Sequence, residues 1–414
     1  MFCIYTQNTN ARMQYVADFC VQYFDLPFTI TNEESVYKEW NGIRINYSQM
    51  ALLEKELLIL PSGLLEEKGI REQQLSPGRH AGYVTLFTNH SVTGFDIFSG
   101  VFYLLSRYEE YLPHVKDSYG RYGHENSIAY KENFLHLPLV DIWLRHFEAL
   151  VHNKFPEYSN AIYEKRSSFR FQPTYDIDVA WSYKNKGLLR NLGGLAKSIT
   201  KRRWAAGKHR LQVLTGKQQD PFDSYGWMSE LHYEYDLKPI YFFHVGQRRN
   251  QYDKNIPTSN KEYQQLIRIT AAKNKIGLHP SWYSGDEMKM LSKEKAILEK
   301  ISLQGISCSR QHYIRFTIPD TFRQLMDTDI YEDYSMGYGT VNGFRASVTV
   351  PFYWYDLERE QETHLLLHPF CFMDANSFYE QKQTSAEALK ELMDYYNRVK
   401  EVDGTLTIIW HNTF

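Results

Sequence analysis

Strand-like and helix-like segments alternate along the chain from Lys238 to Trp410, and this rhythm limits the folds that the chain can adopt. Runs such as 238–246 and 275–279 predict strands, and amphipathic stretches such as 262–272 predict helices. Further helices are expected at 287–301 and 385–400, and further strands at 305–308, 330–334, 343–346, 365–373 and 405–410. Strands that alternate with helices form parallel sheets, and about eight such units form a barrel. We therefore expect an α/β fold whose C-terminal part is a distorted (β/α) barrel of seven to eight strands.

The part of the chain that precedes this rhythm has its own pattern. Short strands and helices are expected at 2–5, 10–24, 43–47, 57–61 and 95–111, which indicates a small α/β or α+β unit. The turn-rich segment 117–126 is expected to be a surface loop. A chain of 414 residues is long enough for two domains. We place an accessory domain at 1–160 and the barrel at 161–414.

Charge and composition exclude several classes of protein. A net charge of -2 and a pI near 6.7 give no general attraction to nucleic acid, and no nucleic-acid partner is expected. The sequence shows neither a secretory signal nor an apolar run of membrane-spanning length. The cysteines lack CxxC spacing and are interpreted as reduced core residues. A cytoplasmic location is therefore expected.

The segment 184–217 contains many lysines and arginines and no acidic residue. Leucines, Ile199 and Trp204 are interspersed among them, although Gly193, Gly194 and Gly207 interrupt the helical pattern. This basic insertion fits three interpretations. It is a peripheral contact with an anionic membrane at the inner membrane face, a grip on a polyanionic or phosphorylated substrate, or a solvated helical hairpin.

Polar side chains stand at the ends of several predicted strands. They are Asp176, Asp178, His279, Arg310, Arg345, Asp374 and His411. In a βα barrel the carboxyl ends of the strands form the catalytic face. Two aspartates also commonly open a loop or cap a helix, and a lone histidine after a strand is more often structural. The shared placement of these residues favours a common site.

Four of these strand ends lie in motifs that resemble those of the polysaccharide deacetylases, the NodB-like family called carbohydrate esterase family 4. Thr174-Tyr175-Asp176-Ile177-Asp178 is similar to the first motif, TFDDG, in its Asp-x-Asp form. The second motif, His-Ser/Thr-x-x-His, resembles His279-Pro280-Ser281-Trp282-Tyr283, and Arg-x-Pro-Tyr resembles Arg310-Gln311-His312-Tyr313. The last motif, Leu-x-x-His, resembles Ile408-Ile409-Trp410-His411. The N-terminal part resembles the extra domain of uncharacterised bacterial homologues.

The resemblance implies a metal-dependent hydrolase that removes N-acetyl groups from a sugar of a cell-surface polysaccharide or its precursor. It implies that Asp176 is the general base, that Arg310 orients it and that His411 is the general acid. Asp178 and His279 would hold a divalent metal, usually zinc. The expected partner is an N-acetylated glycan or polysaccharide precursor.

The chain departs from the family pattern at Tyr283, which stands where the second metal-binding histidine is expected. A catalytic zinc site normally has three protein ligands, so the third is sought among Tyr283, His312 and Asp374. Residues expected to contact the substrate are Ser281, Trp282, Arg345 and Trp410. The alternative is a catalytically degenerate deacetylase-like barrel that binds glycans or acts as a scaffold in polysaccharide or envelope assembly.

Overall fold

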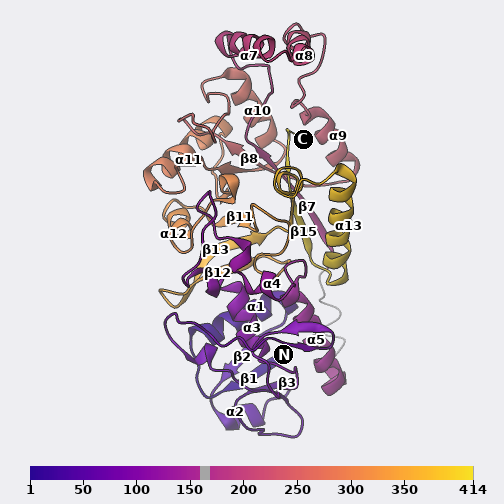
Figure 1. Ribbon diagram of the computed structural model, residues 1–414. Coiled ribbons are helices and arrows are strands. Elements are labelled where there is room, and N and C mark those ends of the chain that lie inside the picture. Colours follow the sequence, from indigo (N-terminus) through magenta and orange to yellow (C-terminus); the bar gives the residue numbers. More distant parts are fainter. Residues whose placement is uncertain (159–167, 414) are drawn as a thin grey trace.

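The computed structural model describes residues 1–158 and 168–413 (Figure 1). The N-terminal part lies at one end of the molecule, a large sheet with its helices occupies the middle, and α7 and α8 lie at the opposite end. The predicted domain boundary at 160/161 lies outside the described residues. Within the described ranges, no helix is both long and apolar enough to span a membrane.

The helices are α1 (Ala11–Phe24), α2 (Glu34–Lys38), α3 (Ile97–Leu105), α4 (Ile128–Lys131), α5 (Leu139–Lys154), α7 (Leu188–Thr200), α8 (Trp204–Leu214), α9 (Tyr225–Glu234), α10 (Lys261–Ala271), α11 (Met288–Ser302), α12 (Asp320–Asp327) and α13 (Ser385–Glu401). The strands are β1 (Phe2–Thr6), β2 (Phe28–Thr31), β3 (Ile43–Tyr47), β4 (Leu57–Ile59), β5 (Gly78–His80), β6 (Tyr83–Thr85), β7 (Arg170–Ile177), β8 (Ile240–His244), β9 (Lys275–His279), β10 (Cys308–Ser309), β11 (Glu332–Met336), β12 (Phe352–Asp356), β13 (Gln361–Pro369), β14 (Phe372–Met373) and β15 (Thr405–His411).

The N-terminal part is built on a four-stranded parallel sheet in the order β2-β1-β3-β4. All five residues of β1 are buried, as expected of a strand covered on both faces. Asn10 begins α1 by accepting a hydrogen bond from the Met13 amide, which is the usual role of an N-cap side chain. The predicted helix at 95–111 is shorter than expected, because α3 ends at Leu105 and a 3-10 turn follows at Tyr108–Glu110.

The C-terminal part is built on a nine-stranded sheet in the order β12-β13-β11-β10-β9-β8-β7-β15-β14. Every neighbouring pair is parallel except β12 and β13, which are antiparallel. The expectation of a mixed α/β chain is confirmed. The sheet differs from the predicted ring of seven to eight strands, because its edge strands β12 and β14 do not pair with each other within the described residues.

The sheet curls strongly, so that side chains from distant strands meet. Two strands separate β7 from β10, and a flat sheet would hold such a pair about 14 Å apart. Nevertheless, Nη1 of Arg310, which follows β10, lies 2.9 Å from Oδ1 of Asp176 on β7. The concave side therefore gathers the carboxyl ends of several strands into one place, as the sequence pattern predicted.

Two strand predictions differ from the structure. No strand forms at 343–346, where Gly343 has a φ of 148° that favours glycine and the chain turns. The expected strand at 365–373 is divided into β13 and β14, because the backbone of Phe370 turns to donate to Met336 in β11.

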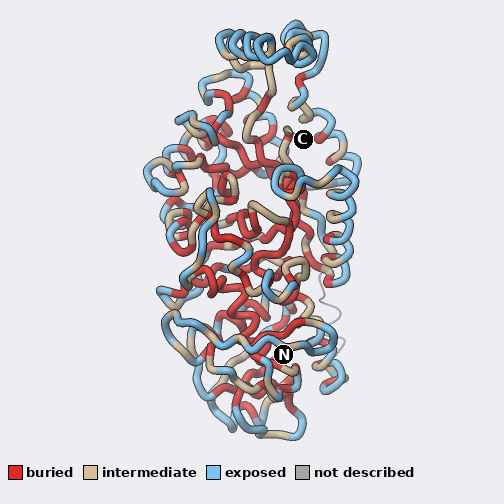
Figure 2. Tube along the Cα trace, in the orientation of Figure 1, coloured by how far each residue is buried: buried red, intermediate tan, exposed pale blue. Residues whose placement is uncertain are grey.

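The two parts of the chain share one hydrophobic core (Figure 2). Tyr15 of α1 donates to the carbonyl of Tyr353 in β12 at 2.8 Å, and Arg12 pairs with Glu360 at 2.5 Å. A buried cluster of charges also joins them: Arg345 contacts Glu110, and Glu110 contacts Arg107. The accessory part is thus packed against the edge of the large sheet.

Candidate functional site

The base of the candidate site is a buried pair between Asp176 and Arg310. Side chains two residues apart on a strand point to the same face, so Thr174 and Asp176 both face the concave side of the sheet. Arg310 is fully buried, and its Nη1 donates to Thr174 Oγ1 at 2.7 Å and to Asp176 Oδ1 at 2.9 Å. Its Nε donates to the carbonyl of Tyr334 at 3.0 Å, and its guanidinium lies 4.4 Å from the ring centre of Phe242. These contacts fix the Asp176 carboxylate.

A group of three potential metal ligands lies beside this pair. One ligand atom each from Asp178, His279 and His312 lies within 4.8 Å of the other two. Nε2 of His279 is 3.0 Å from Asp178 Oδ1, and Nε2 of His312 is 3.5 Å from Asp178 Oδ2. His312 was one of the predicted candidates for the third ligand, and it is the one that the structure places here.

Hydrogen bonds on the far side of each ring determine which nitrogen faces Asp178. Nδ1 of His279 lies 2.6 Å from the carbonyl oxygen of Arg310, and Nδ1 of His312 lies 3.1 Å from a carboxylate oxygen of Asp253. Both Nδ1 atoms must carry a proton to donate to these acceptors, so the Nε2 atoms of the neutral rings present bare lone pairs to Asp178.

Such a donor set requires a cation. The buried Oδ1 of Asp178 accepts no hydrogen bond within the described chain, although Nε2 of His279 is close to it. Two lone pairs and a carboxylate at this separation repel one another unless a proton or a metal ion lies among them. One carboxylate and two imidazoles, with a position left for water, are the usual set for catalytic zinc. The residues present therefore fit the divalent metal that the sequence motifs imply.

The charges of the site shift the pKa values of Asp178 and His312 in opposite directions. Burial raises the pKa of Asp178, but the imidazoles of His312 and His279 outweigh burial and hold it well below its usual range. Burial lowers the pKa of His312, and the carboxylates of Asp178 and Asp253 raise it to about 9. The carboxylates of the cluster thus stabilise a positive charge beside them.

Asp253 and His244 lie on the side of His312 that faces away from Asp178. Oδ1 of Asp253 lies 2.9 Å from Nε2 of His244 and 3.1 Å from Nδ1 of His312, and all three side chains are buried. A carboxylate that accepts from the outer nitrogen of a metal-binding histidine fixes its tautomer and orientation. The sequence analysis did not identify Asp253, which lies in a loop far from the strand-end motifs. His244 could have been identified from the sequence, because it ends β8 and pairs with His279 at the end of the neighbouring parallel strand β9.

His411 stands on the opposite side of Asp178, held by Asp374. Nδ1 of His411 is 2.6 Å from Asp374 Oδ1, and the His411 amide donates to Asp374 Oδ2 at 2.6 Å. Nε2 of His411 faces Asp178 Oδ2 at 3.7 Å. Burial lowers the pKa of His411, and the carboxylates of Asp374, Asp178 and Asp176 raise it to about 10. Asp374 therefore serves His411 rather than the group of potential metal ligands.

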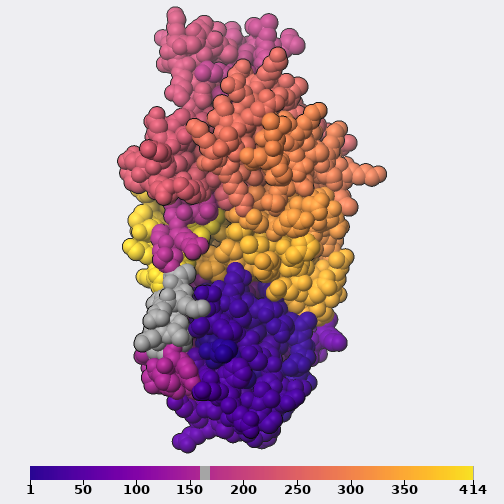
Figure 3. Space-filling view, turned by 180° about the vertical axis from the view of Figure 1, so that it is seen from behind, coloured from indigo at the N-terminus to yellow at the C-terminus, as the bar shows by residue number. Residues whose placement is uncertain are grey.

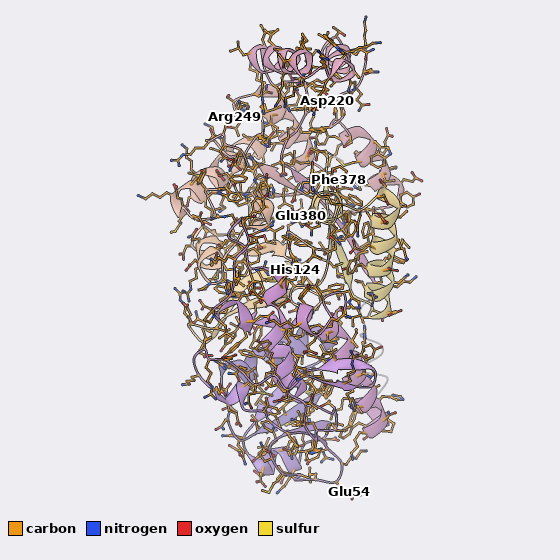
Figure 4. The ribbon with its side chains drawn as sticks, in the orientation of Figure 1. Glu54, His124, Asp220, Arg249, Phe378 and Glu380 are labelled. Atoms are coloured by element: carbon orange, nitrogen blue, oxygen red, sulfur yellow. The ribbon has the colours of Figure 1, made fainter. Side chains whose placement is uncertain are left out.

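These residues open into a cavity of about 660 Å³. Asp176, Asp178, His279, His312 and His411 form its floor, and its walls include Tyr119, Arg121, Phe222, Tyr252, Tyr313, Tyr379 and Glu380. Figure 4 labels Glu380 in the middle of the molecule, between Asp220 towards one end and Glu54 at the other. The walls are aromatic and the floor is charged.

The segment 117–126, expected to be a surface loop, forms part of the cavity wall. Arg121 is buried, and its Nη1 donates to the carbonyls of Tyr313 at 2.8 Å and Gly339 at 3.2 Å. The ring of Tyr119 stacks on that of Tyr313 with centres 5.5 Å apart. The accessory part of the chain thus completes the site, which a local sequence pattern does not reveal.

Tyr283, His312 and Asp374 have separate positions in the structure. The side chain of Tyr283 is 41% exposed and belongs neither to the group of potential metal ligands nor to the cavity lining. The residue after His312, Tyr313, has a φ of 60°, and Ile314 has a φ of 54°. Two successive non-glycine residues with left-handed backbone are costly, and such strain occurs mainly at functional sites.

The four predicted substrate contacts do not line the cavity. Ser281 is buried against Glu294, to which its hydroxyl donates at 2.5 Å. Trp282 stacks on the cavity residue Tyr252, with ring centres 3.7 Å apart, and thus supports the wall from behind. Trp410 lines a separate apolar groove together with residues of α13.

Arg345 has a structural position instead of the substrate contact that we predicted. It is 2% exposed, and its Nε and Nη2 atoms donate to Glu110 at 2.8 and 2.5 Å. Its remaining nitrogen, Nη1, donates to the carbonyl of Gly337 at 3.1 Å. Since all three nitrogens are engaged, we assign Arg345 to the contact between the two parts of the chain.

Comparisons with known proteins give a family for the N-terminal part and remote neighbours for the fold. Residues 2–156 match a family of unknown function, DUF7033. No curated protein matches the chain in sequence. A putative polysaccharide deacetylase from Mycobacterium smegmatis aligns with a TM-score of 0.38 and 14% identity, over 60% of this chain and 78% of that one.

Two further solved structures are more distant. A mutant of a CE4 family pseudoenzyme with restored enzymatic activity aligns with a TM-score of 0.28 and 12% identity, over 59% of this chain and 57% of that one. A polysaccharide deacetylase from Bacillus cereus aligns with a TM-score of 0.27 and 10% identity, over 60% of this chain and 80% of that one. At these scores the neighbours describe a remote likeness, and a functional assignment rests on the side chains of the site.

Proposed function

We propose that the protein is a metal-dependent amidohydrolase that removes N-acetyl groups from a sugar of a cell-surface polysaccharide or its precursor. The observation that carries the proposal is the convergence of Asp178, His279 and His312, whose ligand atoms lie within 4.8 Å of one another. The main argument for a catalytically degenerate site is the missing second histidine of the metal motif. His312 answers that argument, because it supplies the imidazole that Tyr283 does not.

Asp178, His279 and His312 would hold the metal, which is most simply zinc. When bound, such an ion polarises the amide carbonyl and lowers the pKa of water. Asp178 brings one negative charge, while the two imidazoles bring none. The floor of the cavity therefore keeps a net positive charge facing an oxyanion when the site is loaded.

Asp176 is placed to accept the proton of the attacking water. Arg310 holds Oδ1 of Asp176 at 2.9 Å, which leaves Oδ2 facing the His279 side of the cluster at 3.8 Å. A carboxylate whose orientation is fixed needs little rearrangement before it takes a proton.

His411 is placed to return a proton to the leaving amine. With a pKa raised to about 10, the ring is an imidazolium at neutral pH, and its Nδ1 proton is directed to Asp374. The Nε2 proton then points toward the cavity from the side of Asp178. Base and acid thus flank the cluster from two different strands, β7 and β15, as an addition followed by amine departure requires.

The aromatic cavity walls support a glycan as substrate. Tyr119, Tyr252 and Tyr313 line the cavity with aromatic rings that carry polar tips, a combination suited to sugar rings that are apolar on one face and carry hydroxyls at their edges. The volume of about 660 Å³ suits a short segment of a chain rather than a single acetamide group.

The test is release of acetate from N-acetylated oligosaccharides by protein reconstituted with zinc or cobalt. We expect Asp176→Asn to keep the metal and to lose activity by at least about 100-fold. Wild-type protein that carries a metal, binds such glycans and releases no acetate would refute the enzyme. It would support a glycan-binding or scaffolding protein in its place.

A further inference from the structure

The basic insertion forms a helical hairpin that projects beyond the rest of the molecule. It consists of α7, the turn 201–203 and α8, and it forms a narrow extension at one end in the space-filling view (Figure 3). Most of its residues are exposed (Figure 2). In α7 the only buried residue is Asn191, and in α8 the only one is Val213.

This hairpin exposes large apolar side chains. In a hairpin that only faces solvent, such side chains are normally buried or polar residues stand in their place. They are Leu188 (75% exposed), Leu189 (87%), Leu192 (52%), Ile199 (55%), Trp204 (64%), Leu211 (50%) and Leu214 (40%). Leu188, Leu192 and Ile199 recur at helical spacing and share one face of α7. Exposed apolar side chains gathered on one projection usually mark a surface that binds something.

Basic side chains accompany this apolar face. Lys197, Lys201, Arg202, Arg203 and Lys208 are exposed, and no carboxylate of the described chain pairs with them. Two other arginines have structural duties: Arg210 donates to Asn191 at 3.0 Å and joins α8 to α7, and Arg190 donates to the carbonyl of Lys254 at 2.7 Å. Apolar side chains with tryptophan and unpaired lysines and arginines are the combination that lies in the interface of an anionic bilayer.

Hydrogen bonds at the base of the hairpin join it to the rim of the cavity. Asp220 is buried at its base and accepts hydrogen bonds from the amides of Ser182, Tyr183 and Lys184 at 2.7 to 2.9 Å. Figure 4 labels Asp220 and Arg249 at this base. Phe222, two residues after Asp220, lines the cavity.

From these features we infer that the α7–α8 hairpin is a membrane-docking element that binds anionic lipid bilayers by inserting its apolar face between headgroups. The charge of the hairpin selects the anionic surface, and the leucines and Trp204 provide the insertion. Through the Asp220 base, docking holds the cavity at a fixed position next to the membrane, where a membrane-linked substrate would be met. The inference does not depend on the chemistry of the site.

The test is cosedimentation of the full chain with vesicles of phosphatidylcholine alone or with about 30% phosphatidylglycerol at about 0.1 M salt. We expect binding only to the anionic vesicles. Leu189→Ser, Leu192→Ser and Trp204→Ser together are expected to weaken it by about tenfold or more. Lys201→Glu, Arg202→Glu and Arg203→Glu together are expected to weaken it by about 100-fold.

Matched controls change the same chemistry elsewhere. Leu303→Ser removes a leucine that is 79% exposed outside the hairpin, and Lys289→Glu, Lys293→Glu and Lys300→Glu together reverse three exposed charges near α11. Both controls are expected to bind vesicles as the wild type does. Asp176→Asn is expected to bind equally, so that a failure of the proposed function leaves this inference standing.

Three outcomes would overturn the inference. The first is an absence of binding to anionic vesicles. The second is binding that falls on charge reversal but not with the serine variants, which would indicate adsorption to the charged surface without insertion of the apolar face. The third is self-association in sedimentation velocity that the serine variants abolish, which would make a second copy of the chain the occupant of the apolar face.

Discussion

Replacing Arg345 with methionine is expected to destabilise the protein without acting on the cavity directly. In the wild type, Arg345 donates to both carboxylate oxygens of Glu110, at 2.5 and 2.8 Å, and to the carbonyl of Gly337 at 3.1 Å. Removal of one partner of a buried ion pair costs about 3–5 kcal/mol, because the other charge remains buried.

The expected cost lies near the lower end of that range. Glu110 keeps a second partner in Arg345→Met, since Nε of Arg107 lies 2.8 Å from its Oε1. At about 2.1 cal/mol/K of unfolding entropy per residue, a loss of about 3 kcal/mol corresponds to a fall of about 4 °C in the melting temperature of a 414-residue chain. Calorimetry on the full chain measures this fall, and kcat and KM are measured below the melting range.

A double variant separates the structural role from a role in substrate binding. If Arg345 and Glu110 act as a pair, Glu110→Gln with Arg345→Met costs less than the sum of the single changes. The same substitution at Arg310 serves as the comparison, because Arg310 is as buried as Arg345 but contacts Asp176 in the site. An unchanged melting temperature in Arg345→Met, together with a raised KM, would refute the reasoning and return Arg345 to the substrate.

Three further outcomes follow from the same contacts. Asp253→Asn is expected to weaken metal binding by about 10–100-fold, measured by competition with a chelator, because Asp253 orients the His312 ring; unchanged affinity would contradict that role. Asp374→Asn is expected to lower kcat by about 100-fold with KM and metal content little changed, because it removes the negative charge that favours the protonated His411; an equal rise in KM would point to substrate binding instead. Burial raises the pKa of Glu110, but its arginine partners lower that pKa to about 2 from an ordinary 4.5. The contribution of Glu110 to the free energy of unfolding, up to about 3 kcal/mol, is therefore present above pH 4.5 and is lost as the pH falls towards 2. In Glu110→Gln that part of the acid dependence of unfolding is expected to vanish, and an unaltered acid limb would count against the ion pair.

The strand ends of the site were predictable from sequence because side-chain alternation and chain order determine them. Asp176 and His279 stand at the ends of predicted strands, and parallel strands present their carboxyl ends at the same edge. Asp178, Arg310 and His411 follow from the same reasoning, and the structure brings all five together. This part of the site is encoded locally.

The sequence narrowed the third potential metal ligand only to three candidates, and it did not predict the cavity wall. The backbone after His312 passes through Tyr313 and Ile314 with positive φ, a conformation that their side chains disfavour and that no sequence pattern predicts. The 117–126 loop reaches the cavity through contacts such as that of Arg121 with Gly339, far away in sequence. Arg345 was expected in the site because it stands at a predicted strand end. Its partner is instead Glu110, which lies in the other part of the chain.

The central claim is that His312 has taken the place of the missing histidine in a working metal site. Its most direct test is the absorption spectrum and stoichiometry of cobalt in the wild type, His312→Ala and Tyr283→Phe. We predict about one cobalt per chain with the intense bands of a tetrahedral site in the wild type and in Tyr283→Phe, and loss of both in His312→Ala. Cobalt that remains in His312→Ala and disappears in Tyr283→Phe, or wild-type protein that binds none, would contradict the account.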